Sequence, residues 1–147
     1  ETGIKIRKEE REIEDLAKAN AGFSIGIPAI LLSDKAVKML GPMKTLAYIT
    51  LDVATEIPFP FHFLGKVYVK VIEEDRESDY VTAYAIYYPG KRYSLMSDLL
   101  LDDLGIILLE PGKGRWKFRD DPPNIVRETV YTPKFNLREK LKKEGLL

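Results

Sequence analysis

The sequence predicts a mainly β domain at residues 1–121, with two short helices, and a C-terminal extension at residues 122–147. The clearest signal is a hairpin, because residues 67–72 and 80–88 are runs of β-branched and aromatic residues separated by a charged turn. A second signal is the apolar run at residues 27–32, whose length fits a buried strand. With 147 residues, the chain can bury one core but is too short for two domains.

The first elements along the chain carry local signals of different kinds. Residues 8–19 are strong helix formers with acidic residues early, so propensity alone favours a helix there. Residues 35–40 predict a short helix that is capped by Ser33 or Asp34 and ended by Gly41.

The middle of the chain contains a further strand and a proline-rich segment. Residues 46–51 are typical of a strand. Residues 57–61 contain two prolines, which cannot occupy a central position in a sheet. We therefore expect this segment at a sheet edge or in a loop.

The last part of the chain predicts a turn, a strand and a tail. Residues 112–115 lack the spacing of a phosphate-binding loop and are typical of a hairpin turn. The alternation that follows predicts that Trp116 and Phe118 are buried and their cationic neighbours solvated. The extension begins with two prolines and ends in a helix-like stretch at 137–143, so we expect it to wrap the domain or a partner.

The composition excludes several classes of function. Lysine and arginine total 23, as do aspartate and glutamate, so no net charge attracts nucleic acid or an anionic membrane. No apolar run approaches the roughly 20 residues that span a bilayer. The absence of cysteine and the single histidine, His62, argue against a metal site, and we expect no cofactor and assign His62 no chemistry.

Residue usage also suggests an origin. The absence of glutamine, the scarcity of asparagine and the dense mixture of Lys, Arg and Glu are typical of hyperthermophile proteins, so we expect a heat-adapted archaeal protein. No secretory signal is recognisable, and we expect a cytoplasmic location. The sequence begins with Glu1 rather than Met, which leaves the native start open.

Two blocks of sequence carry a resemblance to a known family. The first block is Asn-Ala-Gly-Phe at 20–23, an apolar run at 29–33 and Met-Leu-Gly at 39–41; the second is residues 93–108, which contain Leu-Gly-Ile. In this order they resemble the retroviral-type (retropepsin-like) aspartic proteases. There, an apolar strand enters Asp-Thr-Gly or Asp-Ser-Gly, an amphipathic segment closes on Leu-Gly, and a later strand and helix precede Leu-Gly-Ile.

The resemblance extends over most of the domain and implies its architecture. Residues 111–118 resemble the glycine turn and final strand of archaeal members, so the likeness covers about residues 4–121. It implies a closed retropepsin-like β-barrel in which residues 4–7 and 13–19 are strands. We therefore expect strands at the N-terminus despite the helix propensity of this segment.

The departures from the family bear on activity. Asn20 stands where the family has its catalytic aspartate, Ala21 replaces the hydroxyl residue, and Gly22 alone is retained. Ser97 replaces the glycine before the helix. In the family, each of two subunits supplies one carboxylate, and the pair shares a proton. A carboxamide cannot ionise, so the resemblance implies a catalytically degenerate homodimer that binds an extended peptide or protein, or serves a structural role.

Other interpretations remain open. Residues 20–22 also fit a simple turn or helix C-cap. An active aspartic endopeptidase would need another acid, Asp52 or Asp98, although the short spacing to the second block argues against Asp52. Counted from Asn20, the resemblance places Asp52 where the family has its flap hairpin, so we expect a flap or solvent-facing residue. The chain could equally be an interface subunit of a larger complex.

The flap expected at residues 51–64 supplies candidate ligand-binding residues. Ile57, Phe59 and Phe61 alternate along it and would place apolar groups over a groove, stiffened by the prolines. Packing of these residues in the core or at a subunit interface is the alternative.

Overall fold

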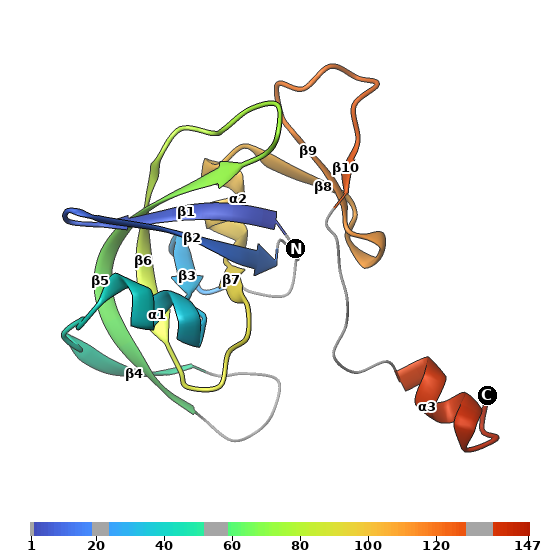
Figure 1. Ribbon diagram of the computed structural model, residues 1–147, viewed down its shortest axis with the longest axis horizontal. Helices are drawn as coiled ribbons and strands as arrows, with labels where there is room; N and C mark the ends of the chain where they lie inside the picture. The colour runs from blue at the N-terminus through green and yellow to red at the C-terminus, as the bar shows by residue number, and fades with distance from the viewer. Residues whose placement is uncertain (1, 19–23, 52–58, 129–136) are drawn as a thin grey trace.

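A computed structural model describes residues 2–18, 24–51, 59–128 and 137–147 of the protein. Within these residues the chain forms ten strands, three α-helices and one 3-10 turn (Figure 1). In chain order these are β1 (Thr2–Lys8), β2 (Arg11–Lys18), β3 (Ala29–Leu31), α1 (Asp34–Leu40), β4 (Ala47–Leu51), β5 (Phe59–Ile72), β6 (Val81–Tyr87), β7 (Ser94–Met96), α2 (Asp98–Asp103), β8 (Ile106–Glu110), η1 (Pro111–Lys113), β9 (Arg115–Phe118), β10 (Arg127–Glu128) and α3 (Leu137–Lys143).

Six strands close into a barrel. The larger sheet has the order β1-β2-β7-β3-β6-β5-β4, and β1 also pairs with β5, which joins the two ends of the first six strands. β4 pairs only with β5 and lies outside this ring. The prediction of a mainly β, closed barrel is confirmed, and α1 and α2 are its two short helices.

The N-terminal segment forms an antiparallel hairpin of β1 and β2, as expected, rather than a helix. Ile4 and Ile6 of β1 are fully buried, and Ile13 and Ala17 of β2 face the same core. Alternate residues of both strands are therefore inside the barrel. This burial, together with pairing of β1 to two neighbours, outweighs the helix propensity of the segment.

α1 begins and ends at the predicted capping residues, and α2 is capped in a similar way. The Ser33 side chain accepts a hydrogen bond from the Ala36 backbone N–H, and Gly41 terminates α1 with a φ of 83°. Ser97 caps α2 in the same way, through the Leu100 N–H. Both caps satisfy backbone donors that would otherwise lack a partner.

β5 is the longest strand and changes the face it presents to the core. A bulge lies between Phe63 and Gly65, where Gly65 has a φ of 92° that favours glycine. Beyond the bulge, Val67 and Val69 point into the barrel core, whereas before it Phe61 and Phe63 pack in a separate cluster. The bulge therefore allows one strand to serve two apolar clusters.

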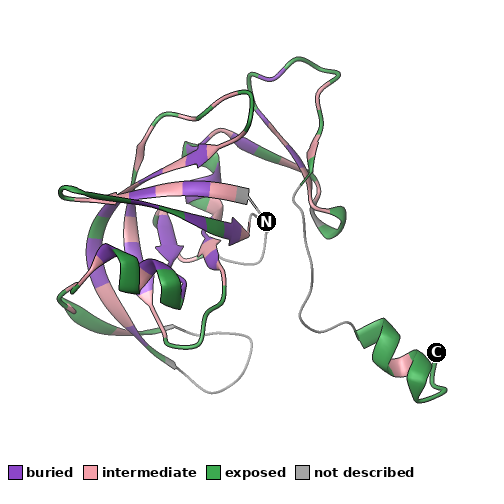
Figure 2. Cartoon of the chain, viewed as in Figure 1, coloured by how far each residue is buried: buried purple, intermediate pink, exposed green. Residues whose placement is uncertain are grey.

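The extension begins as part of a second sheet. β8, β9 and β10 form a three-stranded antiparallel sheet, with Trp116 and Phe118 of β9 buried as predicted. α3 lies away from the barrel, and Figure 2 shows it almost entirely exposed. In the part of the chain that the structure describes, no helix has the length and hydrophobicity required to cross a membrane.

Candidate functional site

The segment that carries Asn20 connects two strands on opposite sides of β7. β2 pairs with β7 in parallel, Ala17 beside Ser94, and β3 pairs with β7 antiparallel, Ile30 beside Met96. β2 and β3 therefore lie on opposite sides of β7. Residues 19–23 lie outside the described residues, whereas the strands that hold the two ends of this segment lie within them.

A buried carboxylate fixes the strand that enters this segment. Asp15 of β2 is 7% exposed, and its Oδ2 accepts hydrogen bonds from Ser33 Oγ at 2.8 Å and Ser94 Oγ at 2.7 Å. Ser94 Oγ accepts in turn from the Ser33 N–H at 3.0 Å, and Ser33 Oγ accepts from the Ala36 N–H. This network, which we call the Asp15 network, joins β2, β7 and the start of α1.

A second serine fixes the strand that leaves it. Ser97 is buried, and its hydroxyl donates to the Ile27 carbonyl oxygen at 3.0 Å and accepts from the Ala29 N–H at 2.8 Å. The Ser97 N–H donates to the Ala29 carbonyl oxygen at 2.9 Å. The start of β3 is therefore tied to the cap of α2. A glycine at this position would provide no such hydroxyl.

An apolar cluster covers the face of the sheet opposite the barrel core. β3 and β6 are buried on both faces: Ile30 and Ala85 point into the core, whereas Leu31 and Ile86 point to this second cluster. Several of its members are only partly buried, which leaves apolar surface beside the β4–β5 hairpin. The second cluster consists of Ala29, Leu31, Phe61 and Ile86, with Ile25, Ile49, Phe63, Tyr88 and Leu95 packed against them.

The candidate site residues that were predicted from the sequence and that the structure describes lie on two different elements, β5 and α2. Phe61 is buried in the second cluster, and Phe59 pairs with Leu51 at the start of β5. Asp98 is the first residue of α2 and is half-buried. Asn20, Ala21, Gly22, Asp52 and Ile57 lie outside the described residues.

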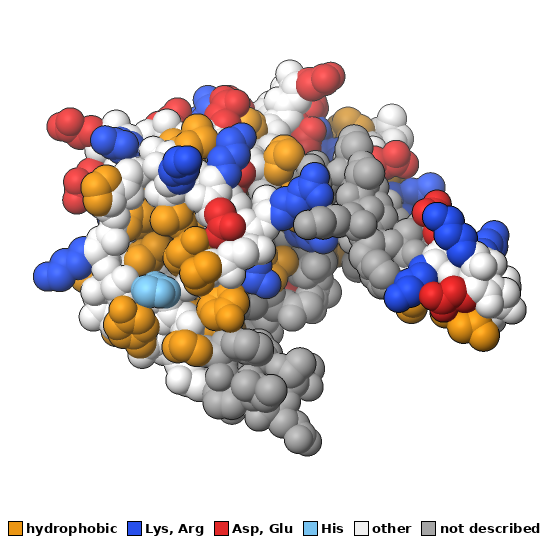
Figure 3. Space-filling view, turned by 60° about the horizontal axis from the view of Figure 1, so that its bottom comes forward, with side chains coloured by type: hydrophobic (Ala, Val, Ile, Leu, Met, Phe, Trp, Pro, Cys, Tyr) orange, Lys and Arg blue, Asp and Glu red, His pale blue; other side chains and the backbone are white. Residues whose placement is uncertain are grey.

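A row of aromatic rings lies across β4, β5 and β6. Tyr48 is paired with His62 at a ring separation of 4.8 Å, and His62 lies 6.2 Å from Tyr87. Thr45 Oγ1 lies 3.0 Å from His62 Nδ1. The Tyr87 hydroxyl donates to Asp34 at 2.8 Å, and burial together with this carboxylate raises the Tyr87 pKa. Figure 3 shows hydrophobic side chains gathered around the histidine.

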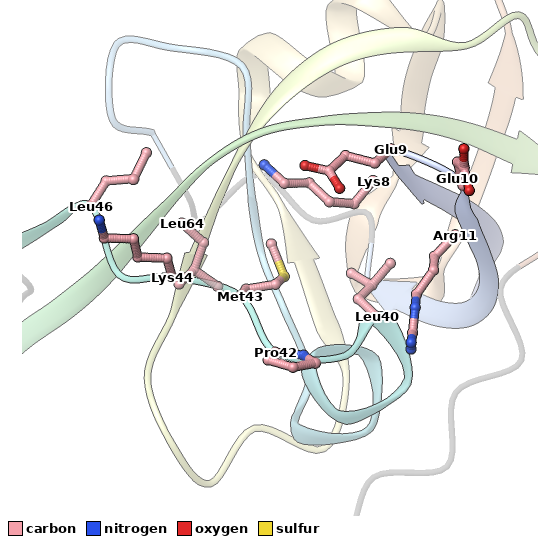
Figure 4. Close-up of a pocket in the computed structure, with 10 residues that line it drawn as sticks. All are labelled: Lys8, Glu9, Glu10, Arg11, Leu40, Pro42, Met43, Lys44, Leu46 and Leu64. Atoms are coloured by element: carbon pink, nitrogen blue, oxygen red, sulfur yellow. The ribbon is translucent and has the colours of Figure 1, made fainter.

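An open pocket of about 730 Å³ lies where the β1–β2 turn, the end of α1 and the segment before β4 meet (Figure 4). Lys8 Nζ donates to the Lys66 carbonyl oxygen at 2.9 Å, and Arg11 lies so close to Gly41 that a Cβ there would be 2.7 Å from a guanidinium nitrogen. Charges of both signs line the pocket, which gives it no strong preference for an ion. The lining residues are Lys8, Glu9, Glu10, Arg11, Leu40, Pro42, Met43, Lys44, Leu46 and Leu64.

A cluster of charges secures the C-terminal extension to the domain. Arg127 donates to Asp121 at 2.9 and 3.0 Å and to Asp75 at 2.6 and 2.9 Å, and its guanidinium lies over the Phe118 ring at 5.0 Å. The hydrogen bonds from Arg127 lower the Asp121 pKa to about 2 and raise the Arg127 pKa. We call these residues the Arg127 clasp.

The sequence prediction did not include the Asp15 network, although a signal for it exists. In the alternation of β2, Asp15 occupies an inward position between Ile13 and Ala17, so a buried carboxylate follows from the period of the strand. A buried carboxylate requires donors. Ser33 and Ser94 supply them, but their proximity to Asp15 depends on the barrel topology.

The described residues contain no group of three His, Cys, Asp or Glu side chains that could hold a metal ion. Comparisons with protein-family models, curated proteins and solved structures found no match to the chain. The strand pairing defines the domain as a closed, mainly β barrel. The family resemblance rests on the sequence motifs alone.

Proposed function

We propose that the protein is a non-catalytic, aspartic-protease-like homodimer that binds an extended peptide or protein segment. The observation that carries this proposal is the second apolar cluster. It is separate from the barrel core, lies beside the β4–β5 hairpin, and retains half-buried side chains from several different parts of the chain. An extended segment laid against such a surface would place alternate apolar side chains in contact with it.

The absence of catalysis is proposed from Asn20, which replaces the family's ionisable acid. The hydroxyls of Ser33, Ser94 and Ser97 hold β2, β3, β7 and the helix caps in place, which supports a structural rather than a catalytic role for these side chains. The Asp15 carboxylate accepts from two hydroxyls and so orders the strands. A carboxamide at position 20 can donate and accept hydrogen bonds without carrying charge.

Selection from a library of extended peptides tests the binding proposal. We expect enriched peptides to be apolar at alternate positions, and Leu95→Asn to weaken their binding at least about tenfold because it places an amide in the second cluster. Leu109→Asn is the matched control, since Leu109 is 42% exposed on β8 in the other sheet. Failure to enrich any peptide, or equal weakening by both variants, would refute the proposal.

Mass spectrometry of the same library after incubation between about pH 3 and 8 tests the absence of catalysis, and we expect no cleavage products. Cleavage that persists in Asn20→Ala and disappears in Asp98→Asn or Asp52→Asn would establish the aspartic peptidase alternative instead.

A further inference from the structure

β4 presents the free edge of the larger sheet. The other six strands of that sheet are closed into the barrel, so each of them has neighbours on both sides. β4 is paired only to β5, through the register that places Tyr48 beside His62 and Ile49 beside Phe61. Its other side therefore offers backbone N–H and C=O groups without a strand partner in the described chain.

Within the described chain, β4 lacks the charged residues, the proline and the bulge that normally prevent strands from pairing between molecules. Protected edges carry charged residues, proline or a bulge. The sequence of β4 is Ala-Tyr-Ile-Thr-Leu, which contains none of the charged residues and no proline. Tyr48 is 70% exposed, and Leu46, immediately before the strand, is 60% exposed. An apolar, uncharged edge of this kind is expected to be covered by another strand.

We propose that the edge is covered by β4 of a second copy of the chain, in an antiparallel pair centred on Tyr48. Two identical antiparallel strands are related by a two-fold axis, so both copies satisfy the same backbone groups. No like charges oppose one another within the pair, because β4 is neutral. The aromatic row of each copy, Tyr48, His62 and Tyr87, would then continue through the two Tyr48 rings into the other copy.

This inference goes beyond peptide binding because it assigns the surface through which two copies associate. Tyr48 lies on the face of the sheet opposite Ile49 and Phe61, which belong to the second cluster. Peptide binding at the second cluster and pairing through β4 use different side chains. The effect of a Tyr48 substitution on dimerisation and the effect of a Leu95 substitution on peptide binding can therefore be measured separately.

A cysteine cross-link tests the pairing directly, since the chain has no native cysteine. In the proposed register, Tyr48→Cys places two sulfurs opposite each other at a separation that a disulfide spans. We expect mild oxidation to convert most of this variant to a covalent dimer. Thr82→Cys is the control, because Thr82 is exposed on β6, a strand that neighbours β5 and β3 and lies away from the β4 edge. Equal cross-linking of the two variants would overturn the proposal.

A charge on the edge tests the same contact without a covalent bond. Tyr48→Lys would place two ammonium groups opposite each other, and we expect sedimentation to show an increase of at least about tenfold in the dimer dissociation constant. Thr82→Lys should leave the dimer unchanged, and circular dichroism should show both variants folded. A wild-type protein that is monomeric at all concentrations, or that pairs β4 only with a foreign peptide, would contradict the inference. Dimerisation of the Tyr48→Lys variant as strong as that of the wild type would contradict it too.

Discussion

Removal of the Arg127 side chain should destabilise the protein substantially and in a pH-dependent way. The Arg127 and Asp121 side chains are only 9% and 2% exposed, and breaking a buried pair by removing one partner typically costs about 3–5 kcal/mol. Asp121 retains the Phe118 N–H at 2.8 Å and Arg76 at 3.4 Å, which moderates the loss. For Arg127→Ala we therefore expect a loss of about 2–3 kcal/mol in the free energy of unfolding near neutral pH.

The pH dependence follows from the depressed pKa of Asp121. Its folded value of about 2 lies below its ordinary value of 3.8, so the stabilisation is fully present above about pH 4 and is lost as the pH falls through 2. The difference between wild type and Arg127→Ala should therefore shrink in acid. Urea unfolding at several pH values between about 2.5 and 7 measures it.

Arg115→Ala is the control for this experiment. Arg115 pairs with Glu110 at 2.9 Å, but the two side chains are 40% and 44% exposed, so the expected loss is under about 1 kcal/mol. A loss below about 1 kcal/mol for Arg127→Ala as well, or a loss that is equal at neutral and acid pH, would refute the clasp as a stabilising device.

Two further predictions concern individual side chains. Asp15→Ala and Ser94→Ala should each lower the free energy of unfolding by about 1–3 kcal/mol. The double variant should lose less than the sum of the two, because both residues belong to one network that includes Ser33. Additive losses in urea unfolding would contradict this. Burial and the hydrogen bond to Glu12 raise the Tyr80 pKa to about 12, so this contribution to stability is present below pH 10 and is lost as the pH rises through 12. Glu12→Gln should lower that pKa, as followed by ultraviolet absorbance, and an unchanged titration would be inconsistent with the assigned cause.

Local chemistry made several elements predictable from the sequence. The charged turn between two β-branched runs indicated the β5–β6 hairpin, and Ser33 and Gly41 marked the ends of α1. The alternation around Trp116 predicted that this β9 side chain is buried, and it packs in the main hydrophobic core. In each case the deciding interactions lie within a few residues along the chain.

Other features depend on contacts that no local pattern contains. Closure of the barrel requires β1 to pair with β5, so that Ile4 lies beside Val71. The second cluster depends on the bulge after Phe63, which reverses the face that β5 presents. The partners of Asp15 come from two distant strand ends. These features follow from topology, which sequence periodicity does not determine.

The length of β5 lets one strand belong both to the barrel ring and to the β4 edge of the larger sheet. From His62 onwards β5 is a barrel strand, paired with β6 and, from Tyr68, with β1. We expect its backbone hydrogen bonds there to open only when the barrel itself opens. Residues 59–63 of β5 pair with β4, which no third strand supports within the described chain. Fluctuations that separate β4 can therefore occur while the barrel stays intact. The edge that we propose to pair with a second copy is thus the part of the sheet whose rearrangement is least opposed by the rest of the fold.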